Sequence, residues 1–310
     1  MVMVRMTRWM GGALAVLLGC GLAPGMAHAE PVSLRHAGTV YNADRATPSA
    51  PAPQAPTVLL VHGTLAHSRM ELMRTLQQLL ADEGVPSLAI NLSLGISDRP
   101  RATLGCDGVV HRHRHTGAVD EIGLWLDWLA ERGASRVVLL GHSRGGNQVA
   151  WFLSEHTHPS VTAGILVAPM TAAEPAGDPA LVERAKTALA EADEGATVIL
   201  DDVPLLYCEA ARASASTVLS YAQAEPRFHT PALLERIDVP LLVVAGGEDR
   251  IVPDLIEAVR PRAQTSETLE LVVIDWADHF FRDLLAMDLV DAALEFLSRL
   301  PAPERAVRAD

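Results

Sequence analysis

The sequence predicts an α/β fold in which helices flank a mainly parallel central sheet that also carries a helical insertion. Short apolar runs alternate with segments of helical periodicity between residues 57 and 300, the pattern of a parallel sheet covered on both faces. In addition, Gly141-His-Ser-Arg-Gly145 joins an apolar run to a helical segment. This places Ser143 on a sharp strand-to-helix turn.

The N-terminal residues 1–29 have the pattern of a secretory signal. Basic residues precede the apolar stretch 11–22, and Ala27-His-Ala29 offers a small-x-small cleavage site before Glu30. The apolar stretch is too short to span a membrane. Alternatively, Leu17-Leu-Gly-Cys20 is a lipobox, and acylation of Cys20 would tether the protein to a membrane. We expect export as a soluble periplasmic or secreted protein.

The mature chain begins with an edge strand or hairpin over residues 31–43 and a proline-rich connector, residues 47–56. Residues 30–56 therefore precede one domain, residues 57–300, and a tail, residues 301–310. The alternation predicts strand 57–61, helix 70–83, strand 87–91, loop 94–115, helix 118–132, strand 137–140, helix 147–156 and strand 161–168.

Composition excludes several classes of function. The 310 residues carry a net charge of −13, which argues against nucleic acid or an anionic membrane surface as partner. Lys186 is the only lysine, so Schiff-base chemistry is not expected. The sequence contains no glycine-rich phosphate loop, and we expect no cofactor.

Three candidate catalytic side chains follow predicted strands in the chain order Ser, acid, His. Ser143 follows the run 137–140, Asp249 follows Leu241–Ala245, and His279 follows an apolar run that begins at Leu269. The carboxyl ends of parallel strands meet at one edge of a sheet. With these motifs and the early His62-Gly63-Thr64, the chain resembles the α/β-hydrolase family, as an exported bacterial-type member, over roughly residues 56–300.

The resemblance implies a role for each motif. Ser143 would be the nucleophile, His279 its general base and later acid, and Asp249 the group that orients the imidazole. The backbone N–H groups of Thr64 and Arg144 would form the oxyanion hole. The resemblance also implies that the insertion, residues 170–229, forms a lid over the substrate site.

Neighbouring residues leave alternatives open. Glu248 competes with Asp249 for the role of the acid, although the Gly-x-x-Asp spacing from Gly246 favours Asp249. Asp278 either raises the pKa of His279 or points into solvent. We expect structural roles for His62 and His142. The Arg144 side chain either binds an acidic substrate group or pairs with a carboxylate from the loops.

The insertion is expected to be helical from the Asp178-Pro179 cap to Glu194, and again over Leu205 to Gln223. Its Cys208 and Cys106 of loop 94–115 are candidates for a disulfide that joins the two segments in an oxidising compartment.

Alternating histidines occupy positions 111, 113 and 115, in the motif His111-Arg-His113-Arg-His115 of loop 94–115. Such a pattern can bind transition metals. With no Cys or acid nearby to complete a ligand set, we expect a polar, basic rim at the active site and no metal site.

The leading interpretation is an exported serine hydrolase that cleaves a small-molecule carboxylic ester through an acyl-enzyme. An acyltransferase on the same triad is an alternative, as is a non-catalytic binding protein that uses the fold as a scaffold. The fold supports many chemistries, so the sequence does not specify the acyl group.

Overall fold

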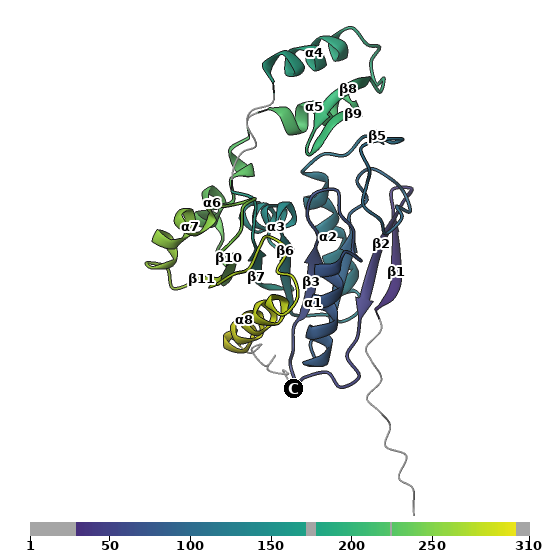
Figure 1. The fold of residues 1–310 in the computed structure, drawn as a ribbon. Coiled ribbons are helices and arrows are strands. Elements are labelled where there is room, and N and C mark those ends of the chain that lie inside the picture. Colours follow the sequence, from purple (N-terminus) through teal and green to yellow (C-terminus); the bar gives the residue numbers. More distant parts are fainter. Residues whose placement is uncertain (1–28, 172–177, 224, 302–310) are drawn as a thin grey trace, which may run out of the picture.

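The computed structural model describes residues 29–171, 178–223 and 225–301. Outside the described residues lie residues 1–28 of the proposed signal sequence, which include Cys20, residues 172–177 and 224 of the insertion, and residues 302–310 of the proposed tail. A central eight-stranded sheet is flanked by helices, and the insertion lies beyond one end of the sheet (Figure 1).

The sheet is mainly parallel, as the sequence predicts. Its order is β1-β2-β4-β3-β6-β7-β10-β11; only the β1–β2 and β2–β4 pairs are antiparallel. In this spatial order the strands are β1 Glu30–His36, β2 Thr39–Ala46, β4 Ser87–Asn91, β3 Thr57–Val61, β6 Val137–His142, β7 Val161–Val167, β10 Leu241–Gly246 and β11 Leu269–Ile274. The parallel strands bring the segments after β3, β6, β10 and β11 to one edge.

Two sets of contacting helices flank the sheet. Helices α1 and α8 contact each other, and α3 contacts both α2 and α6. The helices are α1 Glu71–Asp82, α2 Gly117–Ala130, α3 Arg144–Glu155, α6 Thr230–Leu233, α7 Leu255–Ala263 and α8 Leu285–Arg299, and short 3₁₀ turns span Pro226–Phe228 and Leu234–Arg236. In α1 the apolar residues recur at helical spacing and are buried (Leu72, Met73, Leu76 and Leu80).

The insertion differs from its predicted form. It contains α4 Pro179–Ala190, β8 Ile199–Leu205, β9 Cys208–Ser214 and α5 Ala215–Ala222. The prediction of a helix over Leu205 to Gln223 was therefore wrong in its first half, where β8 and β9 form a hairpin. The alanines of β9 favour a helix locally, but pairing with β8 and burial of Cys208, Ala211 and Ala213 outweigh that preference.

A second, smaller sheet connects the insertion to loop 94–115. Strand β5 (Val110–His111) pairs with β9, giving the order β5-β9-β8. The hypothesised disulfide is present: Cys106 and Cys208 are bonded, with Cα atoms 5.4 Å apart. The insertion contributes Leu181, Val203 and Val218 to a second apolar cluster, which also contains Leu65 and Leu104. The insertion therefore shares a small core with the loop to which it is covalently joined.

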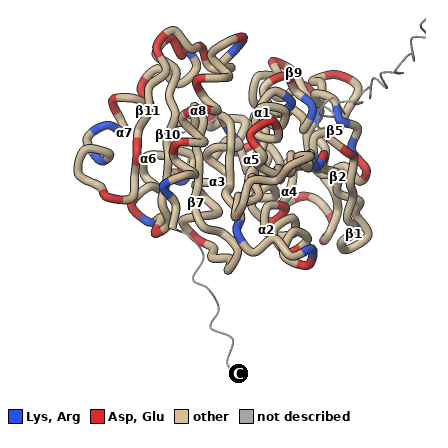
Figure 2. Tube along the Cα trace, turned by 90° about the horizontal axis from the view of Figure 1, so that it is seen from below, with Lys and Arg blue, Asp and Glu red and all other residues tan. Residues whose placement is uncertain are grey.

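Acidic and basic residues are intermixed around the described trace (Figure 2). In the part of the chain that the structure describes, no helix combines the length and the apolar character needed to cross a membrane.

Candidate active site

Ser143 lies on a strained turn between β6 and α3. Its backbone has φ of +56° and ψ of −121°, a conformation that is costly for a residue with a side chain. The flanking glycines make the turn possible, because a Cβ at Gly141 would overlap the carbonyl oxygen of Gly145. A Cβ at Gly145 would overlap the carbonyl oxygen of Val61 on β3. This is the geometry expected of a nucleophile elbow.

Asp249 and His279 meet at the same edge of the sheet, after β10 and β11. His279 Nδ1 donates to Asp249 Oδ2 at 2.7 Å, and both side chains are almost fully buried. Asp249 Oδ1 accepts hydrogen bonds from the backbone N–H groups of Ile251 and Val252. Burial raises the pKa of Asp249, but the bonds from His279 and the two N–H groups outweigh it and leave the pKa below its usual value.

The two neighbouring carboxylates lie elsewhere. Glu248 is exposed, with only its backbone N–H bonded to the carbonyl of Ala277. Asp278 pairs with Arg282 through Oδ2 at 2.6 Å and accepts from the N–H of Phe280 through Oδ1. Neither contact involves the His279 ring, so the geometry favours Asp249 as the partner of His279.

The turn that carries Thr64 lies against the elbow. A Cβ at Gly63 would lie 3.2 Å from Cβ of Ser143. His62 fixes this turn: its Nδ1 donates to the Gly63 carbonyl at 2.9 Å and its Nε2 accepts from the N–H of Leu92 at 3.2 Å. Burial, followed by the charge of Arg99, lowers the pKa of His62 to about 3. The ring is therefore neutral and has the structural role that the sequence predicts.

A comparison of the sequence with models of known families identifies the family of the chain. A model of the alpha/beta hydrolase family matches residues 58–296. The chain belongs to the alpha/beta hydrolase family. No curated protein gives a significant match.

Several solved structures share the fold. Est1E from Butyrivibrio proteoclasticus has a TM-score of 0.58 and 19% identity, with 87% of this chain and 99% of that chain covered. A second structure of Est1E, with ferulic acid bound, has a TM-score of 0.60 and 20% identity over 86% and 100% of the two chains. The alpha/beta hydrolase GrgF from Penicillium sp. sh18 has a TM-score of 0.65 and 16% identity over 87% and 98%. At these identities the likeness shows the fold alone.

In this alpha/beta hydrolase, His142 connects the elbow to the loop that carries His279. Its Nε2 donates to the backbone carbonyl of His279 at 2.8 Å, and the two rings lie 4.9 Å apart. Burial, followed by the charge of His279, lowers the pKa of His142 to about 4. The sequence predicts a structural role for this residue, and the structure identifies what it holds.

Glu121 is a buried polar residue that the sequence analysis did not identify. It accepts from Ser93 Oγ at 2.5 Å and from the Ser93 N–H at 2.8 Å. Burial raises its pKa to about 7. Ser93 follows Leu92, the donor to His62, so Glu121 supports the turn that carries Thr64 through this segment. A glutamate beside Ile122 on the apolar face of α2 was the signal available in the sequence.

In the motif of alternating histidines, the arginines are exposed and the histidines are not, so a polar, basic rim at this loop would be formed by the arginines alone. His111, His113 and His115 are buried, whereas Arg112 and Arg114 between them are exposed. Burial thus alternates along the motif, and the histidines face the interior. Among the described residues, no group of three or more His, Cys, Asp or Glu side chains is arranged to hold a metal.

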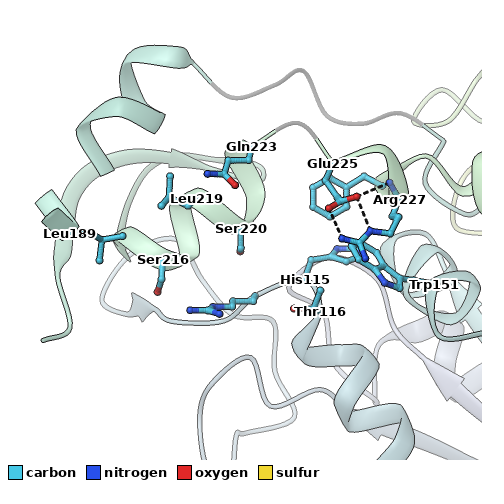
Figure 3. Close-up of a pocket in the computed structure, with 12 residues that line it drawn as sticks. His115, Thr116, Trp151, Leu189, Ser216, Leu219, Ser220, Gln223, Glu225 and Arg227 are labelled. Atoms are coloured by element: carbon cyan, nitrogen blue, oxygen red, sulfur yellow. Dashed lines mark hydrogen bonds and ion pairs between the residues drawn. The ribbon is translucent and has the colours of Figure 1, made fainter. Parts of the chain in front are cut away.

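A cavity of about 440 Å³ lies between the insertion and the core (Figure 3). Its described lining includes Leu219 and Ser220 of α5, His115, and Trp151 of α3, but not Ser143, Asp249 or His279. Trp151 is eight residues beyond Ser143, about 12 Å along the helix at the usual rise. The cavity therefore lies near the elbow but does not reach the three candidate catalytic side chains.

Proposed function

We propose that this alpha/beta hydrolase is an exported serine hydrolase that cleaves small-molecule carboxylic esters, with Ser143, His279 and Asp249 as its triad. The observation that carries the proposal is the buried 2.7 Å bond between His279 Nδ1 and Asp249 Oδ2, at the sheet edge where Ser143 occupies a strained turn. The bond assigns the proton to Nδ1 and leaves Nε2 as the base.

In this mechanism Nε2 of His279 removes the hydroxyl proton of Ser143 as Oγ attacks the ester carbonyl. The N–H groups of Thr64 and Arg144 stabilise the resulting oxyanion. The C–O bond to the alcohol then breaks, and the alcohol leaves with the proton from His279. Water, deprotonated by His279, attacks the carbonyl of the acyl-enzyme. The bond from the acyl carbon to Ser143 Oγ then breaks, His279 returns the proton to Oγ, and the acid is released. Asp249 stabilises the imidazolium in both halves and needs no cofactor to do so.

We propose that the insertion acts as a lid that shapes the acyl or alcohol pocket. It packs beside loop 94–115, to which Cys208 is bonded, and it borders the cavity of about 440 Å³. The esterases among the structural neighbours, one with ferulic acid bound, support a small-molecule ester as substrate. They do not indicate which acyl group this chain accepts.

Export rests on two independent features. The N-terminal sequence has the charge, apolar core and cleavage pattern of a secretory signal. The Cys106–Cys208 disulfide is typical of proteins from oxidising compartments. Processing before Cys20 would instead give a lipoprotein, and intact mass of the secreted form distinguishes the two.

The proposal is tested by labelling the purified mature protein with a fluorophosphonate, beside Ser143→Ala. We expect one adduct on Ser143 by peptide mass spectrometry, ester turnover by the wild type, and neither in the variant. Equal turnover by the variant would refute the assignment. Absence of both adduct and turnover in the wild type would favour a binding scaffold. Ester formation in the presence of an alcohol acceptor, exceeding hydrolysis, would identify an acyltransferase.

A further inference from the structure

The two backbone donors of the proposed oxyanion hole come from separate segments. Thr64 belongs to the turn after β3, and Arg144 is the first residue of α3. Oxyanion stabilisation depends on donors held within a few tenths of an ångström of the developing charge. The distance between the turn and the helix must therefore be fixed by some contact.

The side chain of Arg144 makes such a contact. Its Nε donates to Thr64 Oγ1 at 3.1 Å, and the residue is only 5% exposed. Arg144 thus contributes its own backbone N–H to the proposed oxyanion hole. Through its side chain it also holds Thr64, which contributes the other backbone N–H.

The guanidinium of Arg144 is itself held from two further segments. Its Nη1 donates to His115 Nδ1 at 3.3 Å, and burial, followed by the charge of Arg144, keeps the pKa of His115 well below its usual value. His115 is therefore a neutral acceptor. The ring of Tyr221, on α5 of the insertion, lies 5.5 Å from the guanidinium carbon.

His115 is in turn fixed by packing. Its ring lies 4.7 Å from that of Phe228 and 5.4 Å from that of Trp151, centre to centre. Tyr221 receives a second support, because its hydroxyl lies 2.9 Å from Nδ1 of His113. His115 therefore contacts the Arg144 side chain directly, and His113 supports the Tyr221 ring that lies against the guanidinium.

We propose that the Arg144 side chain is a positioning residue that clamps the two halves of the oxyanion hole together, with Thr64 as its target and His115 as its support. The inference rests on the proposed function and adds to it the means by which the two donors are aligned. It also gives the histidine motif a role in catalysis that requires no metal and no contact with substrate.

The test compares Thr64→Val, Thr64→Ser, Arg144→Met and the double variant Thr64→Val/Arg144→Met. Thr64→Val removes the accepting hydroxyl, but it retains both backbone donors and the arginine charge. Thr162→Val is the matched control, since the Thr162 hydroxyl lies near the start of β7, away from the elbow, and donates to the Val137 carbonyl at the start of β6. The measurements are kcat, KM and the inhibition constant of a trifluoromethyl ketone, whose adduct with serine carries an oxyanion.

We expect Thr64→Val to lower kcat about tenfold with KM within about twofold, the pattern of a contact that matters only in the transition state. Inhibition by the ketone should weaken by the same factor. Thr64→Ser should recover most of the loss, Thr162→Val should match the wild type, and the double variant should be no slower than Arg144→Met.

A normal kcat in Thr64→Val, with turnover and labelling of the wild type intact, would overturn this inference and leave the proposed function standing. Losses that multiply in the double variant would also overturn it, because they would assign the effect of Arg144 to its charge and not to Thr64. A wild type that is neither labelled nor active would overturn the proposed function, and this inference with it.

Discussion

The carboxyl edge of the central sheet and the interior beneath the insertion both contain buried polar groups, but they are held in different ways. At the sheet edge, the turns that carry Ser143 and Asp249 follow the fully buried strands β6 and β10, and the turn that carries His279 follows the partly buried strand β11. Beneath the insertion, His111, His113 and His115 come from a loop whose only strand has two residues. Pairing within the central sheet positions the first region, whereas the second is positioned by the two-residue pairing of β5 with β9, by side-chain packing and by one disulfide.

This difference predicts what each region can tolerate. Changes at the sheet edge should alter chemistry and leave the fold intact, because the strands below are buried in the main apolar core. Changes beneath the insertion should first alter stability, because its own apolar cluster is smaller and depends on contacts far apart in sequence.

The largest expected effect is at the acid. Asp249→Asn should lower kcat about ten-thousand-fold, because the amide no longer holds the His279 tautomer or stabilises its charge. Glu248→Gln is the matched control and should remain within about threefold, since Glu248 is exposed. Ester hydrolysis and thermal unfolding are measured for both. The reverse ranking would move the acid to Glu248.

The second largest effect is expected on stability, when the disulfide of the insertion is removed. Cys106→Ser/Cys208→Ser opens a link between residues 102 apart in sequence and should cost roughly 4 to 5 kcal/mol of unfolding free energy by loop entropy. Calorimetry should show either a lower Tm or a separate early transition of the insertion. We expect kcat to fall far less than in Asp249→Asn. An unchanged unfolding profile would show that side-chain packing alone holds the insertion.

The same difference explains what the sequence could predict. The strand Ser87–Asn91 was predicted with its observed bounds, and the turns at Ser143 and His279 lie where the motifs place them. In each case the information is local: an apolar run sets the strand, and glycine or a polar residue ends it.

Non-local contacts explain the failures. The residues 205–214 have helix-favouring alanines, and only pairing with β8 makes Cys208–Ser214 a strand. Period-2 alternation in the histidine motif is visible in the sequence, but which side faces the interior depends on Tyr221, more than a hundred residues away. The support that Glu121 gives to Ser93 likewise joins two distant segments.

The buried histidines predict a loss of stability in acid. Burial, followed by the charges of His111 and Arg144, lowers the pKa of His113 to about 3. Below pH 6.5 the unfolded chain binds a proton at His113, whereas the folded chain binds it only near pH 3. The free energy of unfolding therefore falls as the pH drops through this window. At pH 5 the contribution is about 2 kcal/mol.

The variant His113→Gln should therefore lose less stability than the wild type between pH 7 and pH 5, although it is less stable at pH 7. Chemical unfolding at both pH values measures the difference. Parallel pH dependence in the two proteins would mean that His113 is charged in the folded state, and that the interior beneath the insertion is more polar than its burial indicates.

The smallest expected effect returns to the sheet edge, at His142. This ring donates to the His279 carbonyl, so His142→Phe should keep the packing and lose the bond that aligns the base. We expect kcat to fall about tenfold, with KM unchanged, as for a contact made through another residue. His142→Gln, whose side-chain amide can reach the same carbonyl, should recover part of the loss. If both variants instead lost stability and kept kcat, His142 would belong with the histidines beneath the insertion, which support the fold and not the reacting atoms.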